Sequence, residues 1–133
     1  MSGAIKPMND DQLDLLSGQT GVANWVTPWR ECSQSHQVSF TIGWAAAAST
    51  AGTLSFEGTD DPTQAAGLVF APETNVVPLT ITTFHGTYPT VSTSAANALV
   101  ILENPPKYVR VKYTFSAGGA AGQFRVMSSA RAT

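Results

Sequence analysis

The clearest pattern in the chain is a strict alternation of apolar and polar residues. Residues 38–44 read Val-Ser-Phe-Thr-Ile-Gly-Trp, and residues 108–115 read Tyr-Val-Arg-Val-Lys-Tyr-Thr-Phe. A period of two is typical of a half-buried β-strand, since successive side chains point to opposite faces. Both segments are therefore predicted strands. In the second, one face belongs to the core and the other, with Arg110 and Lys112, is wet or lies in an interface.

Shorter apolar runs between turn-forming residues predict further strands at 54–56, 68–70, 76–84, 98–103 and 123–129. Pro78 cannot donate to a strand ladder, so its strand is expected at a sheet edge or a bulge. The Gly-rich stretch 117–122 predicts a hairpin turn that pairs the last two strands, and 38–44 is expected to form a loose hairpin with 54–56. The alanine run 45–48 fits that connection, although alanine also favours a helical turn. Residues 59–76 are expected to form a long loop.

Residues 1–35 differ from the rest and are predicted to form an N-terminal arm, which either folds back on its own domain or reaches a neighbour. A short helix is expected from Asp10 to Leu16, capped by Asn9 or Asp10 and stopped by Gly18. Residues 36–133 are predicted to form the folded domain. The fold class expected is all-β: a single β-sandwich or jelly roll of six to eight antiparallel strands with an extended N-terminal arm.

Composition points to contact with other proteins. Apolar residues make up 43% of the 133-residue chain and charged residues only 12%, about half the usual charged share of a soluble domain. Such a surface suits a protein covered by neighbours, although a monomer coated with Thr, Ser, Asn and Gln would give the same composition. The net charge of −2 supplies no positive field for a nucleic-acid partner.

The few charges are unevenly distributed along the chain. Acidic residues cluster at the start, and basic residues follow Glu103: Asp10, Asp11, Asp14, and then Lys107, Arg110, Lys112, Arg125, Arg131. The acidic N-terminus of one copy is therefore a candidate to meet the basic strands of another. Ordinary solvated charges are the alternative interpretation.

The sequence shows no targeting signal and little basis for cysteine chemistry. No stretch reaches the roughly eighteen apolar residues of a membrane span, and the N-terminus lacks a secretory pattern, so we expect cytosolic synthesis and no membrane partner. Cys32 is the single cysteine, which excludes an intramolecular disulfide and a Cys-based zinc site. No catalytic motif occurs. Cys32 with His36 is the nearest approach to a nucleophile and base, but an incidental buried cysteine fits better.

The residues offer two further candidate chemistries, a calcium site and a sugar-binding platform. Glu57, Asp60 and Asp61 lie close in sequence and offer oxygen ligands for calcium, but their spacing matches no calcium loop, and a solvated turn is preferred. A tryptophan platform for a sugar would need Trp25 and Trp29, because the alternation places Trp44 in the core. We therefore predict a non-enzymatic protein with no catalytic residue, cofactor or metal.

The tryptophans at 25 and 29 fit better as anchors of a protein interface, where aromatic side chains concentrate binding energy. The predicted interface combines them with the leucines of the arm and two cations of the 108–115 strand. Its residues are Leu13, Leu15, Leu16, Trp25, Trp29, Arg110 and Lys112.

Three segments carry a resemblance to a known family. They are the strand Gly-Thr-Leu-Ser-Phe-Glu-Gly at 52–58, the strand Tyr-Val-Arg-Val-Lys-Tyr-Thr at 108–114, and the Gly-rich hairpin leading to Gln123-Phe124. In the composition and length of these strands, residues 37–129 resemble the small jelly-roll capsid cement, or decoration, proteins of tailed bacteriophages. No invariant motif is involved, and no single residue's role carries over.

The resemblance implies a structural virion protein on the capsid exterior, made in the host cytoplasm. Such a protein binds the outer surface of the phage head, bridges and stabilises subunits of the major capsid protein, and forms a homo-oligomer on the capsid surface. The alternative function is a receptor- or carbohydrate-binding module of a phage tail or fibre. Exposed aromatic side chains around a concave patch would favour that alternative, and broad faces of low charge would favour the capsid.

Overall fold

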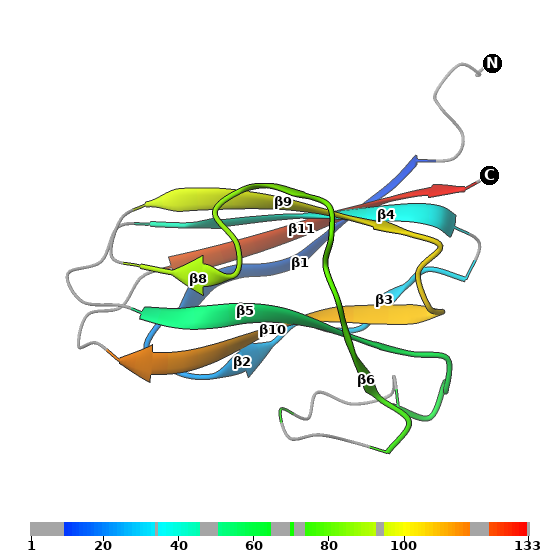
Figure 1. The fold of residues 1–133 in the computed structure, drawn as a ribbon, viewed down its shortest axis with the longest axis horizontal. Coiled ribbons are helices and arrows are strands. Elements are labelled where there is room, and N and C mark those ends of the chain that lie inside the picture. Colours follow the sequence, from blue (N-terminus) through cyan, green and yellow to red (C-terminus); the bar gives the residue numbers. More distant parts are fainter. Residues whose placement is uncertain are drawn as a thin grey trace.

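The computed structural model of the protein describes residues 10–33, 35–45, 51–64, 70, 74–92, 95–117 and 123–132. Within these residues the fold is all-β, with two antiparallel sheets packed face to face (Figure 1). The predicted β-sandwich is thereby confirmed. The described part of the chain holds no helix with the length and apolar character to cross a membrane.

The first sheet, here called the β4 sheet, forms the upper layer in Figure 1. Its strands run in the order β1 (Asp10–Thr20), β11 (Gln123–Ala132), β4 (Ser35–Trp44), β9 (Ala96–Glu103), β7 (Phe84–Gly86). The second, the β10 sheet, has the order β2 (Trp25–Val26), β10 (Tyr108–Ala117), β5 (Ala51–Thr59), β6 (Val77–Leu79). Two further strands join it: β3 (Arg30–Glu31) pairs with β10, and β8 (Thr90–Val91) pairs with β5.

The core lies between the sheets and follows the alternation in the sequence. On β4, Val38, Phe40 and Ile42 are fully buried and Trp44 is 6% exposed, as predicted. Phe40 meets Phe56 of the opposite sheet with ring centroids 5.1 Å apart. Burial of alternate side chains from both inner faces supplies the main stabilisation of the sandwich.

The short helix expected from Asp10 to Leu16 is wrong, because these residues belong to β1. This strand pairs antiparallel with β11 along its length. A two-turn helix gains few hydrogen bonds, whereas a strand completes the ladder of β11 and brings Leu15 and Leu16 against the core. Gly18, with φ of 72°, does not stop a helix but lies at a register shift between Ser17 and Gln19, where a bulge needs a left-handed residue.

Residues 10–33 also differ from the expected arm, since β1, β2 and β3 are built into both sheets. Trp25 of β2 is only 5% exposed. Its ring stacks on Tyr113 at a centroid distance of 5.4 Å and meets Phe124 edge-on at 5.2 Å. The apolar side chains of this segment therefore fill the core of their own domain. Residues 1–9 lie outside the described residues.

Both predicted hairpins are wrong, because each would have joined strands that lie in different sheets. β4 and β11 pair with each other, and β10 pairs with β5. An alternating strand buries the same face whether its sequence neighbour lies beside it or across the core, so periodicity does not select the partner. The predicted strand at 76–84 is shorter, since only Val77–Leu79 form β6 and residues 80–83 belong to no strand, but Pro78 lies on an edge strand as predicted.

More strands form than the six to eight expected, because β2, β3, β6, β7 and β8 are segments of two or three residues. Of the alanine run, 46–48 lie outside the described residues, as do Leu68 and Val69 of the predicted 68–70 strand. Between β6 and β8 the chain crosses from one layer to the other (Figure 1), and β7 adds to β9 on the way.

Candidate protein interface

The outward side of the β4 sheet, here called the β4 face, is a broad surface built by strand register. Side chains of residues paired across antiparallel strands point to the same face. Because Phe40, Val126 and Val100 point into the core, their neighbours along each strand point outward. Two rows cross the centre of the face: Asp14–Met127–Thr41–Leu99–His85, and Gln12–Ser129–Ser39–Ile101.

Two outer rows complete the β4 face. One contains Ser17, Arg125, Gly43 and Asn97, and the other contains Arg131, Gln37 and Glu103. The charged side chains thus lie toward the rim. The positions around β4 carry hydroxyl groups and the partly exposed apolar side chains of Met127, Leu99 and Ile101. An uncharged centre with a polar, charged rim is the usual anatomy of a protein–protein interface.

Contacts within the molecule organise the rim. Arg125 Nη2 lies 3.3 Å from Asp14 Oδ2, with both side chains about half exposed. Gln37 Nε2 donates to Glu103 Oε2 at 2.6 Å. The acidic start of the chain therefore meets a basic residue of its own β11. Asp14 therefore has a basic partner within its own chain, and the uneven charge distribution of the sequence requires no contact with the basic strands of another copy.

The seven residues predicted as an interface do not form one surface. Leu13 is 42% exposed, whereas Leu15 and Leu16 pack against the core. Trp25 is a core residue and Arg110 is completely buried, so neither presents a surface to a partner. Trp29 and Lys112 are partly exposed, but Lys112 lies on β10 and Trp29 packs against Arg110 of that strand, in the other sheet from Leu13.

Arg110 and Lys112 instead belong to a buried ionic cluster on the outer side of the β10 sheet. Glu57 Oε1 accepts from Arg110 Nε at 2.9 Å and lies 2.8 Å from Nη2. Lys112 Nζ lies 3.4 Å from Glu57 Oε2. The guanidinium carbon of Arg110 is 4.5 Å from the Trp29 ring centroid, and Lys112 Nζ is 4.4 Å from that of Phe70. These aromatic rings cover cations that the alternation alone would leave in water.

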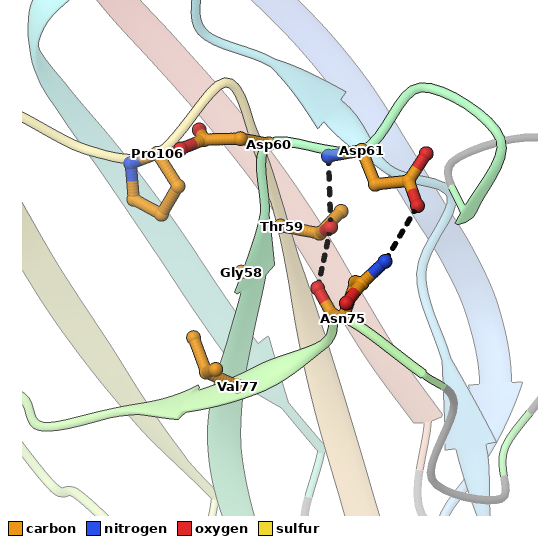
Figure 2. Close-up of a pocket in the computed structure, with 7 residues that line it drawn as sticks. All are labelled: Gly58, Thr59, Asp60, Asp61, Asn75, Val77 and Pro106. Atoms are coloured by element: carbon orange, nitrogen blue, oxygen red, sulfur yellow. Dashed lines mark hydrogen bonds between the residues drawn. The ribbon is translucent and has the colours of Figure 1, made fainter.

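The acidic loop at Asp60 and Asp61, a candidate calcium site in the sequence, lines a hollow at one end of the β10 sheet (Figure 2). Asp61 accepts hydrogen bonds from Asn75 Nδ2 at 3.0 Å, Thr63 Oγ1 at 2.7 Å and Thr63 N at 2.9 Å, which lower the pKa of its carboxyl group. Asp60 Oδ1 accepts from Lys107 N at 2.8 Å. Both carboxylates therefore brace the loop around Thr59, whose hydroxyl donates to Asn75 O.

No group of three or more His, Cys, Asp or Glu side chains is placed to hold a metal ion within the described residues. Cys32 is 2% exposed, and burial raises the pKa of its thiol to about 11. Its Sγ lies 3.3 Å from Arg30 O. A thiol with so high a pKa is a poor nucleophile near neutral pH, which weighs against the Cys32–His36 pair.

Sequence reasoning missed the β4 face, because its rows join residues far apart in the chain. One signal was present: residues 98–103 form a nearly continuous apolar run, which places apolar side chains on both faces of β9. Leu99 and Ile101 are the outward members of that run.

Comparisons with known proteins add only a distant structural likeness. No family model and no curated protein matches the chain. Among solved structures, the N-terminal CBM22-1–GH10 modules of xylanase 10B from Clostridium thermocellum, complexed with xylohexaose, are similar at a TM-score of 0.44 and 10% sequence identity. The match covers 94% of this chain and 26% of that chain. The chain thus spans about a quarter of the xylanase chain, and the likeness names no family for it.

Proposed function

We propose that the protein is a non-enzymatic capsid cement, or decoration, protein of a tailed bacteriophage. In this role it binds the outer surface of the phage head and stabilises the contacts between subunits of the major capsid protein. It reaches the virion after synthesis in the host cytoplasm. The observation that carries the proposal is the β4 face, with its uncharged centre of Met127, Thr41 and Leu99 and its charged rim.

Physical chemistry makes this role coherent with the fold. The β4 face spans strands whose order is fixed by two continuous ladders on either side of β4, so it binds without reordering and loses little conformational entropy. A binder of this kind, specific for the expanded capsid lattice, stabilises that lattice by mass action. The low charge of the chain favours contacts that persist at high ionic strength.

The alternative, a carbohydrate-binding module of a tail or fibre, has less support from the described residues. Sugar sites stack rings on exposed aromatic side chains, but Trp25 and Trp44 lie in the core. Trp29 packs over the Arg110 guanidinium. On the described part of the β4 face, the outward positions hold no Phe, Tyr or Trp.

Co-sedimentation of the purified protein with expanded capsids that lack it tests the proposal. Unexpanded procapsids and tail preparations serve as controls. We expect saturable binding to expanded capsids alone, weakened by Leu99→Glu on the β4 face and retained by Thr114→Glu on the outer side of the β10 sheet. Binding to tails or to glycans, with none to capsids, would overturn the proposal and favour the alternative.

A further inference from the structure

Among the strands that the structure describes, β1 is the long one with an open edge. It spans 11 residues and pairs only with β11. The other strands at the margins of the sheets, β2, β3, β6, β7 and β8, hold two or three residues each, and β6 carries Pro78. Shortness and proline both keep further strands from adding to an edge. From Asp10 to Asp14 β1 has neither, and its register shifts come only after Asp14.

The hydrogen-bond pattern of β11 fixes which backbone groups of β1 face the open side. Ala45 N donates to Gln123 O at 3.0 Å, so the adjacent pair Trp44–Phe124 is not itself hydrogen-bonded. Hydrogen-bonded and non-bonded pairs alternate along an antiparallel ladder. The odd-numbered residues of β11 therefore direct their N–H and C=O groups to β4, and the even-numbered ones direct theirs to β1.

This alternation leaves the backbone of Gln12 and Asp14 open. Leu13 lies opposite Ser128, an even-numbered residue, and is bonded to β11, whereas Gln12 and Asp14 lie opposite odd-numbered residues. Their N–H and C=O groups point away from the sheet, and the described residues provide no partner for them. Donors and acceptors two residues apart on a straight edge match the backbone of an added strand.

The side chain of Leu13 also lacks cover at this edge. Its cross-strand partner Ser128 is buried, so Leu13 points to the inner side of the β4 sheet, yet it is 42% exposed. A strand added beside β1 would place one side chain against Leu13 and its two neighbours on the β4 face. There the side chain of Asp14 remains 48% exposed beside Arg125, so a cation of the partner complements it.

We propose that the edge of β1 from Asp10 to Asp14 binds an extended segment of the major capsid protein, which adds a strand to the β4 sheet. The inference rests on the proposed function and deepens it, because it names the form in which the capsid protein is recognised. The segment carries an apolar residue that covers Leu13 and a basic residue opposite Asp14. Backbone hydrogen bonds supply the affinity, and the alternate side chains supply the specificity.

The added strand continues the β4 face and does not compete with it. Gln12 of β1 lines a hollow of about 140 Å³ together with Thr41, Met127 and Ser129 of the face. Edge and face therefore meet at Gln12. A capsid protein that lies on the β4 face can extend one segment along β1 and keep its contacts with the face.

Gln12→Pro tests the hydrogen bonds of the edge. Proline removes the N–H that faces the open side, but the ladder to β11 does not use this group, so the fold is kept. Gln12→Thr is the matched control, because it changes the side chain and retains the N–H. In co-sedimentation with expanded capsids that lack the protein, Gln12→Pro should bind about tenfold more weakly than wild type, and Gln12→Thr within about twofold of it. Equal binding by Gln12→Pro and wild type would overturn the inference.

Hydrogen–deuterium exchange of the wild type gives a second readout that needs no variant. The amides of Gln12 and Asp14 should exchange freely in the isolated protein and at least about tenfold more slowly on expanded capsids, whereas the amide of Leu13 should exchange slowly in both states. Capsid-bound protein in which Gln12 and Asp14 still exchange freely would overturn this inference alone. Protection of these amides in the isolated protein at high concentration would assign the edge to a second copy and also overturn it.

Failure of the proposed function has a different signature in the same experiment. If wild type, Gln12→Pro and Gln12→Thr all fail to sediment with expanded capsids, the proposed function is overturned, and the partner named for the edge of β1 is overturned with it.

Discussion

Replacing Glu57 with glutamine isolates the energetic role of the ionic cluster on the β10 sheet. Glutamine keeps the shape of the side chain and one carbonyl oxygen, but removes the negative charge that faces Arg110 at 2.8 Å and Lys112 at 3.4 Å. Arg110 is completely buried, so water cannot replace the lost carboxylate. The variant therefore removes the carboxylate that faces the buried Arg110 cation.

The structure sets the size of the effect. Removing one partner of a fully buried ion pair costs about 3–5 kcal/mol. The side chains of Glu57 and Lys112 retain 11% and 15% exposure, which places this site at the lower end, at about 3 kcal/mol of unfolding free energy. For a domain of this length that loss lowers Tm by about 10 °C. Lys112 can turn toward water, whereas Arg110, held under Trp29, cannot.

Urea unfolding followed by tryptophan fluorescence measures this free energy. Glu103→Gln is the matched control, because Glu103 is an exposed acid that accepts one hydrogen bond from Gln37, and its loss should change stability by less than about 0.5 kcal/mol. The double variant Glu57→Gln/Arg110→Met should be more stable than Glu57→Gln alone, since the buried cation that faced Glu57 is then absent. Equal stability of Glu57→Gln and Glu103→Gln would refute the reasoning.

Further expectations concern packing, hydrogen bonding and titration. Gly52→Ala should destabilise the fold by about 1–3 kcal/mol in thermal melts, because the new Cβ would lie 2.5 Å from the ring of Tyr113; an unchanged Tm would contradict this. Tyr113→Phe should cost about 1 kcal/mol, measured by urea unfolding, through loss of the 2.7 Å hydrogen bond from the hydroxyl to Gly21 O, and stability equal to wild type would count against that bond. Burial raises the pKa of the Cys32 thiol from 9.0 to about 11, so the free energy of unfolding should fall as pH rises from about 9 toward 11. At pH 8 the thiol should react with a disulfide reagent only after unfolding, and rapid labelling of the native protein would disprove the burial. Hydrogen bonds lower the pKa of the Asp61 carboxyl group from 3.8, so the ionised carboxylate adds to stability above that pH and its contribution is lost below it. The difference in unfolding free energy between wild type and Asp61→Asn should therefore narrow from pH 6 to pH 3, and a constant difference would exclude the effect.

The sequence by itself determined the two clearly alternating strands and which of their side chains point into the core. Residues 38–44 and 108–115 form β4 and β10, and Trp44 is buried, as the alternation predicts. Pro78 lies on an edge strand for the chemical reason that it lacks an N–H group. These properties are local, since they depend on side-chain period and backbone donors within a few residues.

Only the tertiary structure decided which strands are neighbours. The segment 10–16 has the capping residues and leucines of a short helix, yet it forms β1 because the edge of β11, more than a hundred residues later in the chain, is available for pairing. Trp25 is buried because Tyr113 and Phe124 lie beside it. Such partners are long-range and leave no periodic trace in the sequence.

The candidate surfaces were decided in the same way. Arg110 alternates with core residues and is expected in water or in an interface, but Trp29 and Glu57 cover it from other elements. The β4 face joins Met127, Thr41 and Leu99 from three strands separated widely along the chain. Alternation fixes the direction of each side chain, whereas the row in which it stands depends on register between distant strands, which packing of the whole sandwich selects.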